Sequence, residues 1–86
     1  MNNFEKIDAI YVRLSKLLVE YRIDLTENIG NFNYITEGNL DSFELLSFIS
    51  DVEIEFDIQL TANDFTNTNH HIINGLASLI LKKYDQ

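Results

Sequence analysis

Apolar residues recur at intervals of three and four over most of this chain, which is the spacing of one face of an α-helix. The pattern predicts helices over residues 3–22, 42–56 and 71–84, and a shorter helix that Thr61 could cap. The length of 86 residues allows one domain, which spans residues 1–86. We therefore expect an all-α fold in which three long helices and one short helix surround a single core.

Each long helix has one apolar side that we expect to face this core. These residues are Phe4, Ile7, Tyr11, Leu14, Leu18 and Tyr21 in the first helix, Leu45, Leu46, Phe48, Ile49, Val52 and Phe56 in the second, and Ile72, Ile73, Leu76, Leu79 and Ile80 in the last. Residues 23–40 follow no single period and include Gly30 and Gly38. We expect them to form a long connection that packs back on the core, and long loops in small domains often carry function.

The charge of the chain disfavours two classes of partner. Six basic and fourteen acidic residues give a formal net charge of −8, and such a surface repels nucleic acid and anionic lipid. Residues 41–57 hold six of the acids and no basic residue. No apolar run approaches the roughly 18 residues of a membrane span, and no signal peptide is predicted. We expect a soluble, cytoplasmic, monomeric protein.

The sequence contains no pattern that predicts an enzyme or a metal site. There is no cysteine, so a disulfide, a thiolate nucleophile and a cysteine metal ligand are excluded. His70 and His71 are adjacent, point in different directions on a helix and have no well-spaced acid to complete a metal site. We interpret them as the polar start of a helix. No nucleophile–base pair and no glycine-rich phosphate loop can be named.

The run from Gly38 to Glu44, Gly-Asn-Leu-Asp-Ser-Phe-Glu, opens the second predicted helix. Asp41 is expected to be its N-cap, with Glu44 reaching back in an acidic variant of the capping box. Both acids suit the positive end of the helix dipole. Ser42 would then present its hydroxyl at an exposed helix N-terminus. An isolated serine there is most often only a helix start, but it needs no catalytic partner of its own if another enzyme modifies it.

The order of these parts resembles the acyl and peptidyl carrier proteins over about residues 35–80. Their prosthetic-group motif, Asp-Ser followed by an apolar residue, is matched by Leu40-Asp41-Ser42-Phe43, and the run Glu55-Phe56-Asp57-Ile58 with Leu60 also matches. Within that family the chain is most similar to the D-alanyl carrier proteins of cell-wall teichoic acid modification. That likeness rests on Gly38-x-Leu40-Asp41-Ser42, Phe56-Asp57-Ile58, Asn67-Thr68 and Ile72-Ile73-x-Gly75.

The resemblance implies a four-helix carrier fold and a free-standing carrier function. Ser42 would bear 4′-phosphopantetheine, with Asp41 capping the helix beside it, and the thiol of that arm would hold an acyl or aminoacyl group as a thioester. A phosphopantetheinyl transferase would attach the arm from coenzyme A with magnesium. An activating ligase or acyltransferase would load the cargo, and an acceptor synthase or transferase would receive it. D-alanine or another amino acid is the first candidate cargo, and a fatty or polyketide acyl chain is its rival.

The second helix is also the expected docking surface for these enzymes. The predicted contact residues are Phe43, Glu44, Asp51, Ile54 and Glu55. Their acidic members would steer basic partner enzymes towards Ser42. Phe43, Ser47 and Ile54 depart from the family pattern, so the partners and the cargo stay open. The alternative function is an unmodified acidic helical module that binds a basic protein partner.

Overall fold

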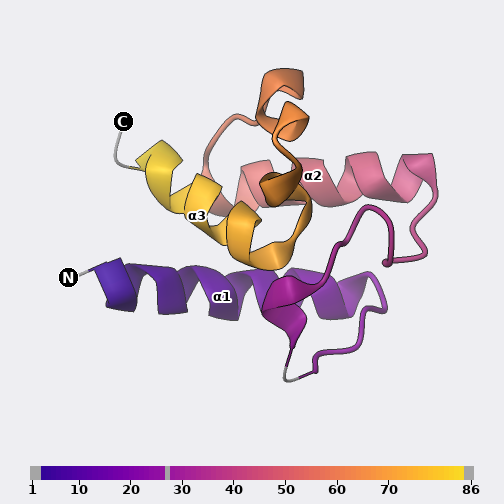
Figure 1. Ribbon diagram of the computed structural model, residues 1–86, viewed down its shortest axis with the longest axis horizontal. Coiled ribbons are helices and arrows are strands. Elements are labelled where there is room, and N and C mark those ends of the chain that lie inside the picture. The colour runs from indigo at the N-terminus through magenta and orange to yellow at the C-terminus, as the bar shows by residue number, and fades with distance from the viewer. Residues whose placement is uncertain (1–2, 27, 85–86) are drawn as a thin grey trace.

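The computed structural model describes residues 3–26 and 28–84, which are mostly helical (Figure 1). The α-helices are α1 (Asn3–Glu20), α2 (Ser42–Phe56) and α3 (Ile73–Tyr84), and the 3₁₀ segments are η1 (Ile29–Asn31), η2 (Ala62–Thr66) and η3 (Thr68–His71). The expected all-α class is confirmed. None of the helices in these ranges combines the length and the apolar content that a membrane crossing requires.

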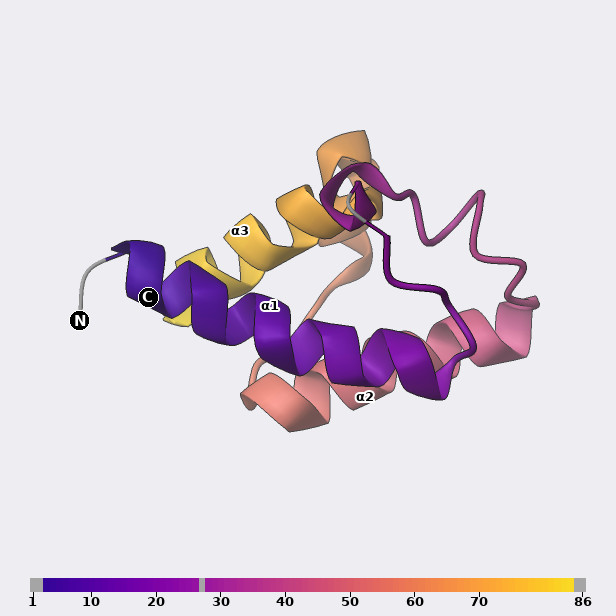
Figure 2. The same ribbon diagram turned by 90° about the horizontal axis from the view of Figure 1, so that it is seen from below.

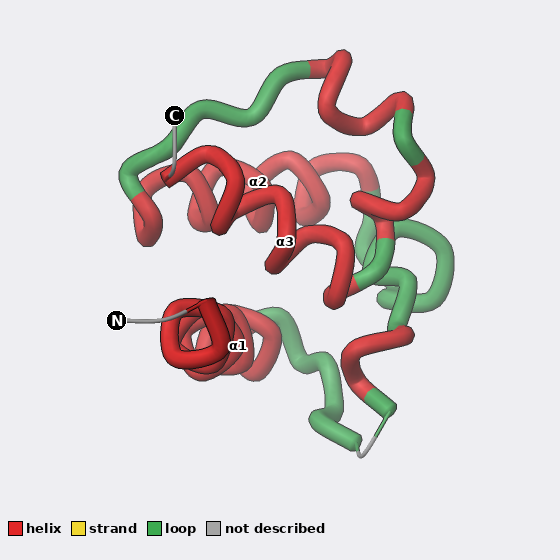
Figure 3. The backbone as a smooth tube through the Cα atoms, turned by 60° about the vertical axis from the view of Figure 1, so that its left-hand side comes forward, coloured by secondary structure: helices red, strands yellow, loops and turns green. Residues whose placement is uncertain are grey.

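The helices α1 and α2 lie side by side and run in opposite directions, and α3 runs obliquely to α1 (Figures 1 and 2). A view nearly along α1 shows α2 and α3 together on one side of it (Figure 3). The start of α2 consequently lies at the end of the molecule that is remote from the start of α1 and from the end of α3 (Figure 2).

Apolar side chains from all three helices form one core. Its buried members are Ile10, Leu14, Leu17, Leu18, Ile23, Tyr34, Phe48, Val52, Phe56, Ile73, Leu76, Ala77, Leu79 and Ile80. The prediction for Leu46 is wrong, because its side chain is 65% exposed. Two residues correspond to about 200° of helix rotation, so Leu46 lies nearly opposite the buried Phe48. The side chain of Phe4, also predicted to face the core, is outside the described part of the chain.

Two predicted helix ends differ from the structure because the backbone turns there. The first helix ends at Glu20 and not at residue 22, since Arg22 takes a left-handed conformation with φ 63°. The N–H of Ile23 then bonds to the carbonyl of Leu18 at 3.0 Å and the N–H of Arg22 bonds to that of Val19 at 3.0 Å. This is the Schellman pattern that terminates helices. The last helix begins at Ile73 and not at residue 71, because η3 occupies the preceding residues.

The short segment predicted after Thr61 is the 3₁₀ turn η2. Thr61 caps it as expected: its hydroxyl accepts a bond from the N–H of Asp64 at 3.3 Å, and its own N–H bonds to the Asp64 carboxylate at 2.8 Å. The bond pattern is 3₁₀, and a fourth α-helix is not present in residues 3–26 and 28–84. The predicted count of four helices is therefore reached only if this 3₁₀ turn is included.

Residues 21–41 connect α1 to α2 and are attached midway to the start of α3. The N–H of Tyr34 donates to the carbonyl of His71 at 3.1 Å, and the N–H of Ile73 donates to the carbonyl of Phe32 at 3.1 Å. Tyr34 is fully buried, its hydroxyl donates to the carbonyl of His70, and its ring centre lies 5.3 Å from that of Phe48. Burial raises the pKa of the Tyr34 hydroxyl well above its ordinary value. The connection is thus part of the packed structure.

Gly75 allows α3 to approach η3 closely. A Cβ atom at this position would lie 1.6 Å from the carbonyl oxygen of Asn69, which is a backbone atom that cannot rotate away. We predict that Gly75→Ala lowers the free energy of unfolding by about 2 kcal/mol or more, because overpacking forces the backbone to shift. Ser78→Ala, an exposed change in the same helix, should stay within about 0.5 kcal/mol. Urea unfolding followed by circular dichroism measures both, and equal values would contradict this account.

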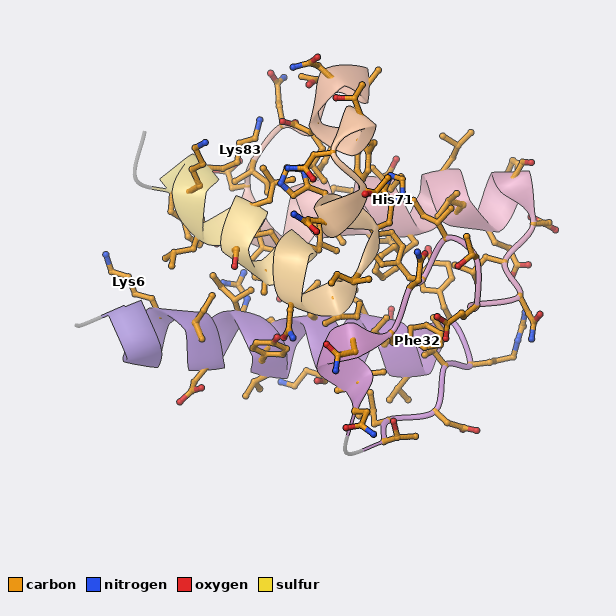
Figure 4. The ribbon with its side chains drawn as sticks, in the orientation of Figure 1. Lys6, Phe32, His71 and Lys83 are labelled. Atoms are coloured by element: carbon orange, nitrogen blue, oxygen red, sulfur yellow. The ribbon has the colours of Figure 1, made fainter. Side chains whose placement is uncertain are left out.

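The ion pair of Lys83 and Asp64 makes stability depend on pH. Lys83 lies on the side of α3 that faces η2 (Figure 4), with its Nζ 2.9 Å from the Asp64 carboxylate. Burial alone would raise the pKa of Asp64, but the N–H of Thr61 and the Lys83 ammonium outweigh it and lower the pKa below the ordinary 3.8. The carboxylate therefore stabilises the fold above that ordinary value, and its contribution is lost as the pH falls through the lowered pKa.

We predict that Lys83→Met flattens the acid limb of a stability–pH curve measured by urea unfolding between neutral pH and pH about 2. Lys82→Met is the matched control, because Lys82 is exposed on the same turn of α3. Identical curves for the two variants would show that the ion pair carries no pH-dependent stability.

Candidate functional site

Ser42 is the first residue of α2, and it is exposed. The preceding Asp41 is extended, with φ −74° and ψ 174°, and its Oδ1 accepts a bond from the N–H of Glu44 at 2.8 Å. Glu44 Oε1 accepts in return from the N–H of Asp41 at 3.4 Å. The predicted capping box is confirmed. The Ser42 hydroxyl is consequently presented to solvent at a helix N-terminus that has a defined cap.

The residues that lead into Ser42 are shaped by a tight turn and an apolar anchor. A Cβ atom on Gly38 would lie 2.6 Å from the carbonyl oxygen of Tyr34, so glycine is needed there, and Asn39 is left-handed with φ 54°. Leu40 and Leu45 are half-buried against the core. They hold the positions of a hydrophobic staple, one just before the cap and one on the next turn of the helix. This staple fixes the direction in which the chain enters α2.

The end of α1 supports the same helix start. The Arg22 guanidinium lies 2.9 Å from Glu44 Oε2, while the other carboxylate oxygen of Glu44 completes the capping box. The left-handed backbone of Arg22 directs the chain away from α1 at this point. Arg22 was not among the residues that the sequence indicated. Its position next to Glu44 depends on the antiparallel packing of α1 and α2, which no local pattern reveals.

The two other acids predicted to dock partners are also paired, Asp51 with Tyr21 just after α1 and Glu55 with Arg13 of α1. The hydroxyl of Tyr21 donates to Asp51 Oδ2 at 2.5 Å. The pKa of Tyr21 is raised to about 12, mainly by burial and secondly by this hydrogen bond. Arg13 Nε donates to Glu55 Oε1 at 2.9 Å, and its guanidinium lies 4.5 Å from the centre of the Phe56 ring. These acids therefore form an interhelical row.

The two apolar residues predicted for docking face solvent, unlike the three acids. Phe43 and Ile54 are each 79% exposed. Leu46, which the sequence assigned to the core, is 65% exposed and projects from the same outer side of α2. The five predicted docking residues thus divide into three acids with partners inside the molecule and two apolar side chains that face solvent.

Glu53 of α2 also has a partner. Its Oε2 accepts a bond from the N–H of Leu60 at 2.9 Å. That bond holds the extended residues after α2 against the helix. Asp57 has a left-handed backbone with φ 52°, and it ends α2 just before these extended residues.

The adjacent histidines hold η2 and η3 together. His70 Nδ1 lies at the carbonyl oxygen of Asp64, and His71 Nε2 lies 2.8 Å from that of Phe65. The His71 ring stacks on Phe65 with 6.5 Å between ring centres (Figure 4 labels His71). In the described ranges, no three His, Asp or Glu side chains gather where they could hold a metal ion.

The surface beside the start of α2 has room for an attached group. A hollow of about 270 Å³ is lined by Arg22, Ile23, Asp24, Thr26, Phe32, Glu37, Gly38 and Asn39. It adjoins the turn that immediately precedes the helix, and Phe32, labelled in Figure 4, contributes an aromatic wall. An exposed hydroxyl, a helix N-terminus suited to a phosphodiester and this adjoining hollow together fit a 4′-phosphopantetheine arm.

Comparison with known proteins adds no relative: no protein-family model, no curated protein and no solved structure matches this chain.

The cap and the serine beside it should contribute differently to stability. We predict that Asp41→Ala lowers the free energy of unfolding by about 1 kcal/mol, because it removes an N-cap. Ser42→Ala should change the free energy of unfolding by less than about 0.5 kcal/mol, because the Ser42 side chain is exposed and does not cap the helix. Urea unfolding measures both variants. A cost for Ser42→Ala as large as that for Asp41→Ala would assign Ser42 a structural role.

Proposed function

We propose that this protein is a free-standing carrier that holds an acyl or aminoacyl group on a 4′-phosphopantetheine arm attached to Ser42. The observation that carries the proposal is the exposed Ser42 hydroxyl at the first residue of α2, directly after the Asp41 cap. Ser42 is the attachment residue, Asp41 is a positioning residue, and neither is a catalytic residue.

The helix start supplies what an attached phosphodiester needs. The Ser42 hydroxyl oxygen would form the new bond to the phosphorus that bears the pantetheine arm, and its proton would pass to a base of the transferase. The pyrophosphate P–O bond of coenzyme A would break, with adenosine 3′,5′-bisphosphate as the leaving group. The backbone N–H groups of the first helical turn favour the negative charge of the diester. The bond from the Glu44 N–H to Asp41 keeps this turn intact whether or not the serine is modified.

The arm brings a thiol that carries the cargo as a thioester. The chain has no cysteine, so the thiol that forms the thioester must come from the arm. The hollow beside Gly38 and Asn39 offers the first part of the arm a surface to lie on. The cargo is proposed to be D-alanine or another amino acid, with a fatty or polyketide acyl chain as the rival.

We predict that a promiscuous phosphopantetheinyl transferase with magnesium and coenzyme A adds the mass of one arm to this protein. Ser42→Ala should abolish the addition, while Ser50→Ala, an exposed serine on the same helix, should leave it intact. Intact-protein mass spectrometry measures all three proteins. An unchanged mass, or an addition that persists in Ser42→Ala, would refute the carrier function.

The alternative, an unmodified module that binds a basic protein, gives a different result. In that case Ser42→Ala leaves partner binding intact, and Glu44→Lys with Asp51→Lys abolishes it. The exposure of Ser42 favours the carrier, and the internal pairing of Glu44, Asp51 and Glu55 disfavours a purely acidic contact.

A further inference from the structure

A basic residue, Arg22, lies at the same end of the molecule as Ser42. The end of α1 and the start of α2 are together there (Figure 2), and the Arg22 guanidinium is 2.9 Å from Glu44 Oε2. The other oxygen of the Glu44 carboxylate accepts a bond from the N–H of Asp41, the residue before Ser42. A single carboxylate therefore separates the guanidinium from the cap beside the serine.

The backbone of Arg22 is held in place, while its side chain can move. The N–H of Arg22 bonds to the carbonyl of Val19, and the next residue, Ile23, is buried. The Arg22 side chain is 80% exposed. A guanidinium has five N–H donors, and the bond to Glu44 Oε2 takes one of them. The guanidinium can thus turn to another acceptor without a change in the fold.

The hollow of about 270 Å³ beside the helix start connects Arg22 with the approach to Ser42. Arg22 contributes to one part of its lining, and Gly38 and Asn39, which lie shortly before Ser42 in the chain, contribute to another. The phosphodiester is the first group of the arm after the serine oxygen. An arm that leaves Ser42 and enters this hollow would therefore bring its phosphodiester towards the guanidinium.

The charges around the site make Arg22 the counter-ion that a phosphodiester needs. Carboxylates of four residues line the hollow or form the cap, namely Asp24, Glu37, Asp41 and Glu44. Between Lys16 and Lys82 the sequence contains one lysine or arginine, which is Arg22. A phosphodiester adds a further negative charge to this group of acids, and like charges at close range repel. Arg22 is the basic side chain placed to offset that repulsion.

Resting on the proposed function, we infer that Arg22 binds the phosphodiester of the arm on Ser42 and gives up Glu44 when the arm is present. Arg22 is then a positioning residue, which directs the first part of the arm into the hollow between the end of α1 and the turn at Gly38. An arginine suits this task, because its planar fork of N–H donors matches two oxygens of a phosphate group.

The first experiment observes the phosphorus atom itself. The parent protein, Arg22→Gln and Arg22→Lys are converted to the arm-bearing form with the promiscuous phosphopantetheinyl transferase, magnesium and coenzyme A, and intact mass verifies one arm on each. We expect the ³¹P NMR signal of the diester to shift in Arg22→Gln relative to the parent. Arg22→Lys should recover part of the parent signal, because lysine keeps the charge and loses the planar fork.

The second experiment measures thermal unfolding of each protein with and without the arm, so that the cost of the substitution itself cancels. We expect the arm to lower the midpoint of Arg22→Gln by about 3 °C more than that of the parent at low salt, as the loss of one exposed ion pair implies. This difference should largely vanish at about 1 M salt. The matched control is Lys16→Gln, an exposed basic residue of α1 that does not line the hollow. It should behave like the parent in both experiments.

The inference is overturned if Arg22→Gln keeps the ³¹P signal of the parent, or if the arm shifts the midpoints of Arg22→Gln and Lys16→Gln equally. Neither result affects the carrier function, because both are measured on proteins that already bear the arm. If the parent protein never gains the arm, the carrier function fails and the role of Arg22 fails with it.

Discussion

The burial of Phe48, Val52 and Phe56 against α1 and α3 sets the rotation of α2 about its own axis. These residues are spaced four apart and form one face of the helix. The rings of Tyr21 and Tyr34 lie 5.5 and 5.3 Å from that of Phe48. With this face turned inwards, Phe43 lies about 180° away from its centre. The exposure of Ser42, Phe43 and Ile54 follows from this packing.

The cap of α2 could be predicted because its partners are close in sequence. Asp41 and Glu44 are three residues apart, so their mutual bonds need no tertiary information. The bounds of α2 followed from that cap and from the apolar period up to Phe56. The end of α1 did not follow, because Arg22 leaves the helix through a left-handed backbone that its residue type does not favour. The start of α3 depended on η3, whose 3₁₀ bonds leave no clear period.

The partners of the acids on α2 could not be predicted from the sequence. Glu44, Asp51 and Glu55 meet Arg22, Tyr21 and Arg13, which lie 22, 30 and 42 residues away. Only the antiparallel register of α1 and α2 brings these groups together. The net charge of −8 suggested an acidic face free for a basic partner. Leu46 was predicted to face the core for a related reason. The apolar side that the sequence predicts for the second helix is wider than the face of α2 that is buried in the structure.

The attachment of residues 32–34 to the start of α3 has a consequence for the segment before Ser42. The bonds of Tyr34 to His71 and of Ile73 to Phe32 divide the connection into two shorter loops. Each loop has its own closure entropy, which grows only slowly with length. Added residues near Thr26 would therefore enlarge the first loop alone and leave the approach to the serine at its present length. Evolution can vary the front half of this connection without changing how the hydroxyl is held.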